Sequence, residues 1–225
     1  MAWQPLRGTS KRWALSSSKP MGPRLLWILL FTIVLIFIWL GWSPKADRFT
    51  WFMENLPVMV GVPILIGTCR RFPLTPLLYG LLTLHVLILM VGGHYTYAEV
   101  PMGFWIRDWL HLTRNPYDRL GHLAQGFVPI LLFREVLFRK GILKPGGWSV
   151  WVLLMMVLGF SAAYELLEWL TAVSIGSKAD AFLGTQGDLW DTQWDMACAF
   201  IGGSLALLCL GKLHHRQMAA IKGLS

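Results

Sequence analysis

Long apolar runs separated by polar segments dominate the chain. A membrane-spanning helix needs about 20 consecutive, mostly apolar residues. The second apolar run is the weakest, because Glu54, Pro57 and Pro63 interrupt it, and the third contains His85. The pattern predicts an all-α bundle of six membrane-spanning helices. The six runs are residues 25–42, 52–69, 74–91, 120–138, 148–173 and 192–210.

The polar stretch between the third and fourth runs contains an amphipathic piece at residues 104–112. We expect a short helix there, lying at the outer membrane surface. The basic segment before the first run resembles the start of a signal peptide, but the run is too long and no small-residue cleavage site follows it. With no internal repeat, one membrane domain is expected at residues 25–211, between basic cytoplasmic tails at 1–24 and 212–225.

The composition supports an integral membrane protein. Of the 225 residues, 55% are hydrophobic and only 14% are charged, whereas a soluble domain carries about 25% charged residues. Most of the 13 Trp residues are expected to anchor helices at the membrane interface. The three cysteines, Cys69, Cys198 and Cys209, lie in or beside apolar runs, so we expect free thiols.

The basic residues are distributed unevenly between the two sides of the predicted bundle. Fourteen of the 20 Lys and Arg fall on the side of both termini, which places the termini in the cytoplasm by the positive-inside rule. The net charge of +8 is therefore expected to meet anionic membrane lipid. Nucleic acid is not an expected partner, because no basic stripe interleaved with exposed aromatic residues occurs.

The acidic residues show the opposite distribution. Eleven of the 12 fall at the outer side, and only Glu135 lies on the inner side. Helical spacing places several of them on shared faces near the outer ends of the last three spans, since residues three or four apart are neighbours on a helix. We expect six of these polar side chains to converge in the outer half of the bundle. They are Asp118, His122, Glu165, Glu168, Asp191 and Asp195.

Facing carboxylates in a partly dry bundle cannot all ionise unless a cation, protons or arginines offset their repulsion. A divalent cation held by Asp118, Asp191 and Asp195 is one solution. In that case His122, Glu165 and Glu168 are the candidate catalytic residues. Raised carboxylate pKa values, which would make proton donors or relays, are the other solution. The outer loops supply further candidates for a substrate pocket, namely His94, Tyr95, Glu99, Gln186 and Asp188.

Four segments resemble the bacterial inner-membrane YjdF family. They are VGGHYTYAEVP (91–101), NPYDRLGHLAQGF (115–127), YELLEW (164–169) and ADAFLGTQGDLWDTQWDM (179–196). The resemblance implies a multi-pass inner-membrane protein and assigns no catalytic residue. A looser likeness to VanZ-like membrane proteins rests on the order of the Asp118/His122 pair, Glu165 with Glu168, and Asp191 with Asp195 before Gly202. Asp195 departs from the amide that is usual there.

Three hypotheses of function follow. The first is an outward-facing, metal-dependent hydrolase or transferase acting on a lipid-linked or envelope substrate. The second is a small proton-coupled permease, which the uniformly apolar appearance of the inner half disfavours. The third is a non-catalytic assembly partner, whose acids pair with Arg107, Arg114 or Arg119 and leave no cavity. His214 and His215 are expected to be solvated in the C-terminal tail. Phosphate-binding loops and serine-hydrolase or zinc-protease motifs are absent.

Overall fold

The computed structural model describes residues 21–176 and 180–222, and in these ranges the chain is helical, without strands. All six long helices are long and apolar enough to cross a membrane, which confirms the prediction of a six-span, all-α protein. They are α1 (Pro23–Trp42), α2 (Arg48–Thr68), α3 (Pro76–Tyr95), α5 (Tyr117–Arg139), α6 (Gly147–Ile175) and α8 (Asp191–Lys222). The short elements are η1 (Tyr97–Glu99), α4 (Pro101–Leu110) and α7 (Asp180–Leu183).

Residues with defined backbone roles begin several of these helices. Proline stands in the first turn of α1, α3 and α4, where its missing N–H costs nothing. Asp47 caps α2, since its Oδ1 accepts hydrogen bonds from the backbone N–H groups of Phe49 (2.9 Å) and Thr50 (3.1 Å). The second span is continuous despite Pro57 and Pro63, as transmembrane helices tolerate proline.

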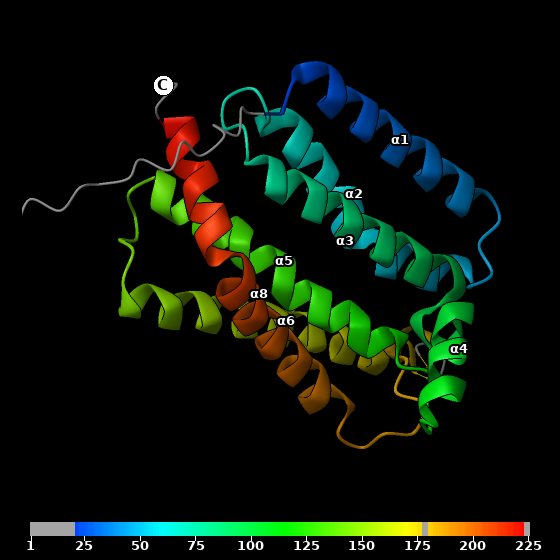
Figure 1. Cartoon of the computed structure of the whole chain (residues 1–225). Helices are drawn as coiled ribbons and strands as arrows, with labels where there is room; N and C mark the ends of the chain where they lie inside the picture. The colour runs from blue at the N-terminus through cyan, green and yellow to red at the C-terminus, as the bar shows by residue number, and fades with distance from the viewer. Residues whose placement is uncertain (1–20, 177–179, 223–225) are drawn as a thin grey trace, which may run out of the picture.

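α5 lies between two groups of helices, with α1 to α3 on one side and α6 and α8 on the other (Figure 1). Its most extensive packing is against α8. Glycine permits this close crossing, because a Cβ atom at Gly126 would clash with the carbonyl oxygen of Ala199, and one at Gly202 with that of Leu123. The crossing brings the first turns of α5 and α8 near each other, and both turns carry carboxylates.

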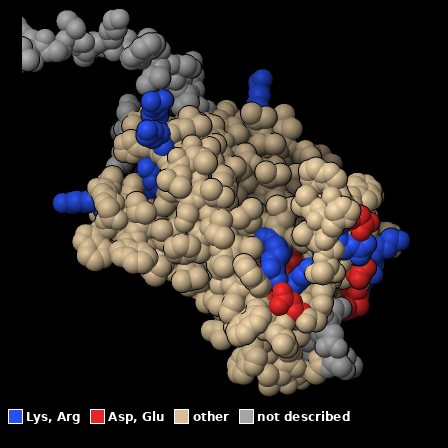
Figure 2. Space-filling model, turned by 60° about the horizontal axis from the view of Figure 1, so that its bottom comes forward, with Lys and Arg blue, Asp and Glu red and all other residues tan. Residues whose placement is uncertain are grey.

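Charged side chains gather toward the two ends of the molecule. On the face shown in Figure 2, acidic and basic side chains lie together toward one end, and basic side chains alone lie at the opposite end. The first end carries α4 and the start of α5. We call it the acidic end, and the end that carries Arg71, Lys140 and Lys212 the basic end. The acidic end is the side that the charge pattern predicts to be outer.

The last helix extends beyond its predicted end. α8 continues through residue 211 to Lys222, and His214, Met218 and Ile221 on it are buried. The prediction that His214 is solvated is therefore wrong: the helix continues back over the bundle, so its side chain faces α5. His215, the next residue, is exposed, as expected.

A buried polar cluster ties three helices together at the basic end. Glu135 on α5 accepts hydrogen bonds from the backbone N–H of Thr75 (3.0 Å), from Arg139 (2.7 Å) and from Nε2 of His214 (2.8 Å). Nη1 of Arg134 lies 3.0 Å from Nδ1 of His214. Because arginine only donates, Nδ1 accepts and Nε2 carries the proton that His214 donates to Glu135. The inner half is thus not uniformly apolar, which corrects that expectation.

A helix is present where the amphipathic piece is predicted, but it covers residues 101–110 and ends at His111, which adopts a left-handed conformation (φ 53°). Trp105 and Trp109 on it are exposed. Its position at the membrane surface and the cytoplasmic location of the termini stay predictions. The N-terminal tail up to residue 20 and Lys178 lie outside the described residues. All three cysteines are free, as expected.

Candidate functional site

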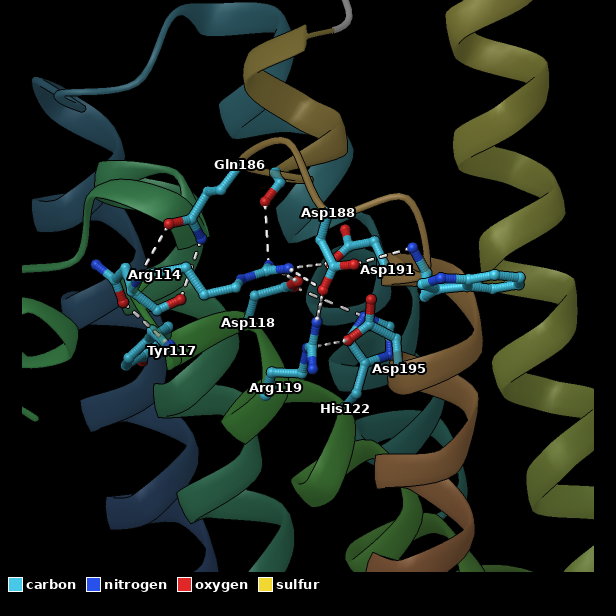
Figure 3. Close-up of polar contacts among 12 residues, drawn as sticks. Arg114, Tyr117, Asp118, Arg119, His122, Gln186, Asp188, Asp191 and Asp195 are labelled. Atoms are coloured by element: carbon cyan, nitrogen blue, oxygen red, sulfur yellow. Dashed lines mark hydrogen bonds and ion pairs between the residues drawn. The ribbon is translucent and has the colours of Figure 1, made fainter. Parts of the chain in front are cut away.

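The loop before α5 is held in place by side-chain to backbone hydrogen bonds. Asn115 accepts a hydrogen bond from the N–H of Tyr117 (3.0 Å) and donates to the carbonyl of Val100 (3.0 Å). The amide of Gln186 pairs with both backbone groups of Asn115, accepting from its N–H (2.9 Å) and donating to its carbonyl (3.0 Å) (Figure 3). These bonds fix the start of α5 against the segment that leads into α8.

Arg114 and Arg119 pair with two acids around the start of α8. Nη1 of Arg114 donates to Oδ1 of Asp191, and Nη2 of Arg119 donates to Oδ2 of Asp188 at 2.7 Å (Figure 3). Asp188 also accepts a hydrogen bond from the backbone N–H of Trp190. That bond and the nearby Arg119 guanidinium hold the pKa of Asp188 below its usual range. Both acids therefore have arginine partners at the start of α8.

A second group of polar atoms lies beside these ion pairs. One potential ligand atom from each of Asp118, His122 and Asp195 lies within 4.8 Å of the other two. Nε2 of His122 is 3.7 Å from Oδ1 of Asp118 and also 3.7 Å from Oε1 of Glu165 on α6. Asp195 is 2% exposed and His122 is 6% exposed. We refer to Asp118, His122, Glu165 and Asp195 as the ligand cluster.

Three buried atoms of the ligand cluster have no hydrogen-bond partner among the described residues: Nδ1 of His122, Oε1 of Glu165 and Oδ1 of Asp195. An unsatisfied buried polar atom costs about 1–3 kcal/mol, so such atoms usually meet water, a proton or a ligand. Two protein ligands of a tetrahedral zinc ion are about 3.4 Å apart. The 3.7 Å spacing from His122 to Asp118 is close to that value, and the potential ligand atoms of Asp118, His122 and Asp195 all lie within 4.8 Å of one another. Small side-chain movements would bring this donor set around a divalent cation such as zinc or manganese.

A cavity of about 90 Å³ adjoins the ligand cluster. A single buried water needs only about 10–15 Å³ on the same measure, so the cavity holds several waters or a small chemical group. Burial raises the pKa of Tyr97, which lines it, well above the usual value. The cavity wall therefore combines acids with aromatic rings and histidine. Its polar lining is Glu54, His85, Tyr97, Asp118, His122, Gln125, Tyr164 and Glu168.

Carboxylates outnumber the arginines around this cavity and cluster. Seven acids stand against only Arg114 and Arg119 among the described residues that form ion pairs there. Repulsion of this size in a buried site requires bound protons or a bound cation. The acids are Glu54, Asp118, Glu165, Glu168, Asp188, Asp191 and Asp195.

The structure brings most of the predicted ligand and catalytic residues together. Asp118, His122, Glu165 and Asp195 meet in the ligand cluster, and Glu168 lies on the cavity wall. The third predicted metal ligand, Asp191, pairs with Arg114 and lies outside the three-residue group.

None of the five predicted substrate-pocket residues lines the cavity. Nδ1 of His94 lies 2.9 Å from the carbonyl oxygen of Leu40, and Tyr95 packs edge-on against His94. Glu99 is exposed in η1. Gln186 and Asp188 hold the loops around α5, as described above. His94, Gln186 and Asp188 thus hold neighbouring segments of the chain together, a role that local composition does not distinguish from lining a pocket.

Five polar residues of the cavity lining were not predicted as site residues, namely Glu54, His85, Tyr97, Gln125 and Tyr164. Glu54 on α2 is 2% exposed, and its Oε1 accepts a hydrogen bond from Thr96 (3.1 Å). Tyr97 comes from the same loop as Tyr95. The sequence did contain a signal for Glu54, because a carboxylate inside an apolar membrane-spanning run is costly unless it faces the interior of the bundle. Tyr97 carried no such signal.

The fold and site define a multi-pass helical membrane protein with a buried carboxylate and histidine site near one end. Residues 25–216 match the family model described as "Predicted membrane protein (DUF2238)". The chain is also 48% identical to the inner membrane protein YjdF of Escherichia coli (strain K12) over 201 residues, covering 89% of this chain and 96% of the relative. The chain belongs to this family of inner-membrane proteins, which confirms the resemblance seen in its motifs. No solved structure matches it.

Proposed function

We propose that this protein is a metal-dependent hydrolase or transferase that acts on a lipid-linked or envelope substrate at the outer side of the membrane. The observation that carries the proposal is the ligand cluster, in which Asp118, His122 and Asp195 converge from two helices. Oδ1 of Asp195 and Oε1 of Glu165 are buried there without a hydrogen bond from the described residues. A purely structural network would satisfy these atoms by hydrogen bonds.

In this scheme Asp118, His122 and Asp195 hold one divalent cation. Such a cation lowers the pKa of a bound water and supplies a nucleophile at neutral pH. Glu165, whose Oε1 is 3.7 Å from Nε2 of His122, would be the general base beside such a cation. Arg119, whose Nε is 3.6 Å from Oδ1 of Asp195, orients this carboxylate.

The charge of the site favours a neutral reacting group. Glu54, Glu168 and Asp118 line the cavity, so a phosphate entering it would face several carboxylates. An ester, amide or glycosidic bond carries no charge and avoids that repulsion. We therefore propose a neutral bond of this kind in the substrate.

The test is metal analysis of the purified protein before and after titration with zinc or manganese. Wild type is expected to hold about one ion per chain, and His122→Ala and Asp195→Ala are expected to bind more than tenfold more weakly. Asp108→Asn is the matched control, because Asp108 is exposed and pairs only with its neighbour Arg107 among the described residues. If wild type binds no more metal than Asp195→Ala, the metal-dependent function is wrong.

The proton-coupled permease is the second candidate. It is favoured by the extent of the cavity, which reaches from the ligand cluster to Glu54, Glu168 and His85, and the buried Glu135–His214 pair removes the objection that the inner half is apolar. For a permease we expect that a pH gradient drives uptake of the transported solute into proteoliposomes. Glu168→Gln is expected to abolish this uptake and to leave the metal content of the protein unchanged. The assembly hypothesis expected the acids to pair with arginines, as Asp188 and Asp191 do, but it also expected no cavity, and one is present.

A further inference from the structure

A larger cavity lies at the basic end of the bundle. It measures about 650 Å³ and lies between α2, α3, α5 and α6. Thr68, the last residue of α2, and Lys140, directly after α5, are among its lining residues. Asp118 of the ligand cluster precedes Lys140 by 22 residues, which corresponds to about 33 Å along a helix. The two cavities share no lining residue, although they approach within one helical turn on α5, at Pro129 and Leu132. The rim at Lys140 is therefore the part of the larger cavity that lies far from the ligand cluster.

The walls of the larger cavity are apolar and open to the side of the bundle. Leu132 and Phe133 contribute from α5. Ile64 on α2 and Met156 on α6 line the cavity and are 58% and 43% exposed, so the opening faces the region that lipid chains occupy around a membrane protein. Gly61 widens it, since the space where its Cβ would stand is empty to 4 Å. The volume lies within the range of about 300–1,000 Å³ that is usual for ligand sites.

Two basic side chains stand at the rim of this hollow. Arg71 and Lys140 line it and are exposed, and neither forms an ion pair with a carboxylate of the described chain. Glu135, the acid at this end, already accepts hydrogen bonds from Thr75, Arg139 and His214. Two positive charges are thus left unneutralised beside an apolar hollow.

We propose that this cavity binds a glycerophospholipid with an anionic headgroup. The acyl chains occupy the apolar hollow, and the headgroup phosphate is held by Arg71 and Lys140. Basic pockets between transmembrane helices select anionic lipids in this way, because each Lys or Arg near the phosphate adds attraction that a zwitterionic headgroup partly cancels. Arginine also matches phosphate geometry with two parallel hydrogen bonds.

Native mass spectrometry of the full chain in detergent tests the proposal by titration with phosphatidylglycerol or phosphatidylcholine of identical acyl chains. Wild type is expected to bind one phosphatidylglycerol about tenfold or more tightly than phosphatidylcholine, and the double variant R71Q/K140Q is expected to lose this preference. The matched control is K144Q/K212Q, which removes two exposed charges from the same end outside the cavity and should keep the preference.

A variant that fills the cavity tests the role of its volume without changing the charges at its rim. Gly61→Phe leaves both rim residues in place and is expected to weaken binding of both lipids about tenfold, with an unchanged melting temperature in lipid-free detergent because the new side chain enters empty space. Three outcomes would overturn the proposal. They are equal binding of the two lipids by wild type, equal behaviour of the two double variants, and wild-type lipid binding by Gly61→Phe. A second copy of the chain occupying the hollow, seen as a dimer that Gly61→Phe dissolves, would also overturn it.

Discussion

Nε2 of His122 on α5 lies 3.7 Å from Oε1 of Glu165 on α6, and both side chains are buried. The separation is too long for a hydrogen bond. It is short enough for a cation or a water molecule to bridge the two atoms. In the proposed function His122 is a metal ligand and Glu165 is the general base, so the two residues have different roles.

Replacing Glu165 by glutamine distinguishes these roles. If Glu165 acts as the base, Glu165→Gln keeps all three proposed ligands, and its zinc dissociation constant stays within about threefold of wild type. His122→Ala removes a ligand and should bind more than tenfold more weakly. Isothermal titration with zinc measures both constants. Equal weakening in the two variants would instead make Glu165 a ligand.

Arg119→Gln is expected to raise cation affinity several-fold. The substitution removes the positive charge of a guanidinium whose Nε lies 3.6 Å from Oδ1 of Asp195. The electrostatic potential at a bound cation therefore becomes more negative. The same variant should have a lower melting temperature, because Asp188 loses the hydrogen bond from Arg119 and keeps the one from the Trp190 N–H. Arg107→Gln, which affects an exposed pair, should change neither quantity. Unchanged cation affinity in Arg119→Gln would count against Asp195 as a ligand.

The close crossing of α5 and α8 at Gly126 leads to a prediction about the stability of the protein. Gly126→Ala places a methyl group against the carbonyl oxygen of Ala199 and is expected to destabilise the protein by about 1–3 kcal/mol. Gly159→Ala on α6 is the control, because no atom lies within 4 Å of its Cβ position, and alanine there favours the helix by up to about 1 kcal/mol. Melting temperatures in detergent should therefore move in opposite directions. A shift of the same sign in both would show that the crossing is not tight.

His214 and His215 are neighbours in sequence that differ in burial, so they form a matched pair for a test of stability. His214→Ala leaves the Glu135 carboxylate without one of its hydrogen bonds and is expected to cost about 1.5–3 kcal/mol, the range for hydrogen bonds to charged groups. His215→Ala, at an exposed position, should stay within about 0.5 kcal/mol of wild type. Thermal unfolding in the same detergent compares them. Similar losses in both variants would contradict the role of the cluster.

Reporter fusions test the predicted orientation in the membrane. The excess of Lys and Arg on the side of both termini predicts that a reporter fused after residue 145 is cytoplasmic and one after residue 178 is periplasmic. Alkaline phosphatase is active only when exported, so the second fusion should be active and the first inactive. The reverse activities would invert the topology and place the ligand cluster at the cytoplasmic side.

The sequence by itself determined the six spans and the helical faces that carry the acids. Both signals are local, because apolar length sets a span, and steps of three and four align Asp118 with His122 and Asp191 with Asp195. The family also followed from contiguous motifs, as the match over residues 25–216 confirms.

Only the tertiary structure decided which acids meet and which pair with arginines. Asp191 and Asp195 lie on the same face of α8, yet Asp191 accepts a hydrogen bond from Arg114 while Asp195, 3.6 Å from Nε of Arg119, joins the ligand cluster. The close crossing at Gly126 and Gly202 determines which part of α5 each of them faces. His214 reaches Glu135 from 79 residues away for the same reason. Such encounters depend on how helices distant in sequence cross, and no local spacing in the chain encodes that geometry.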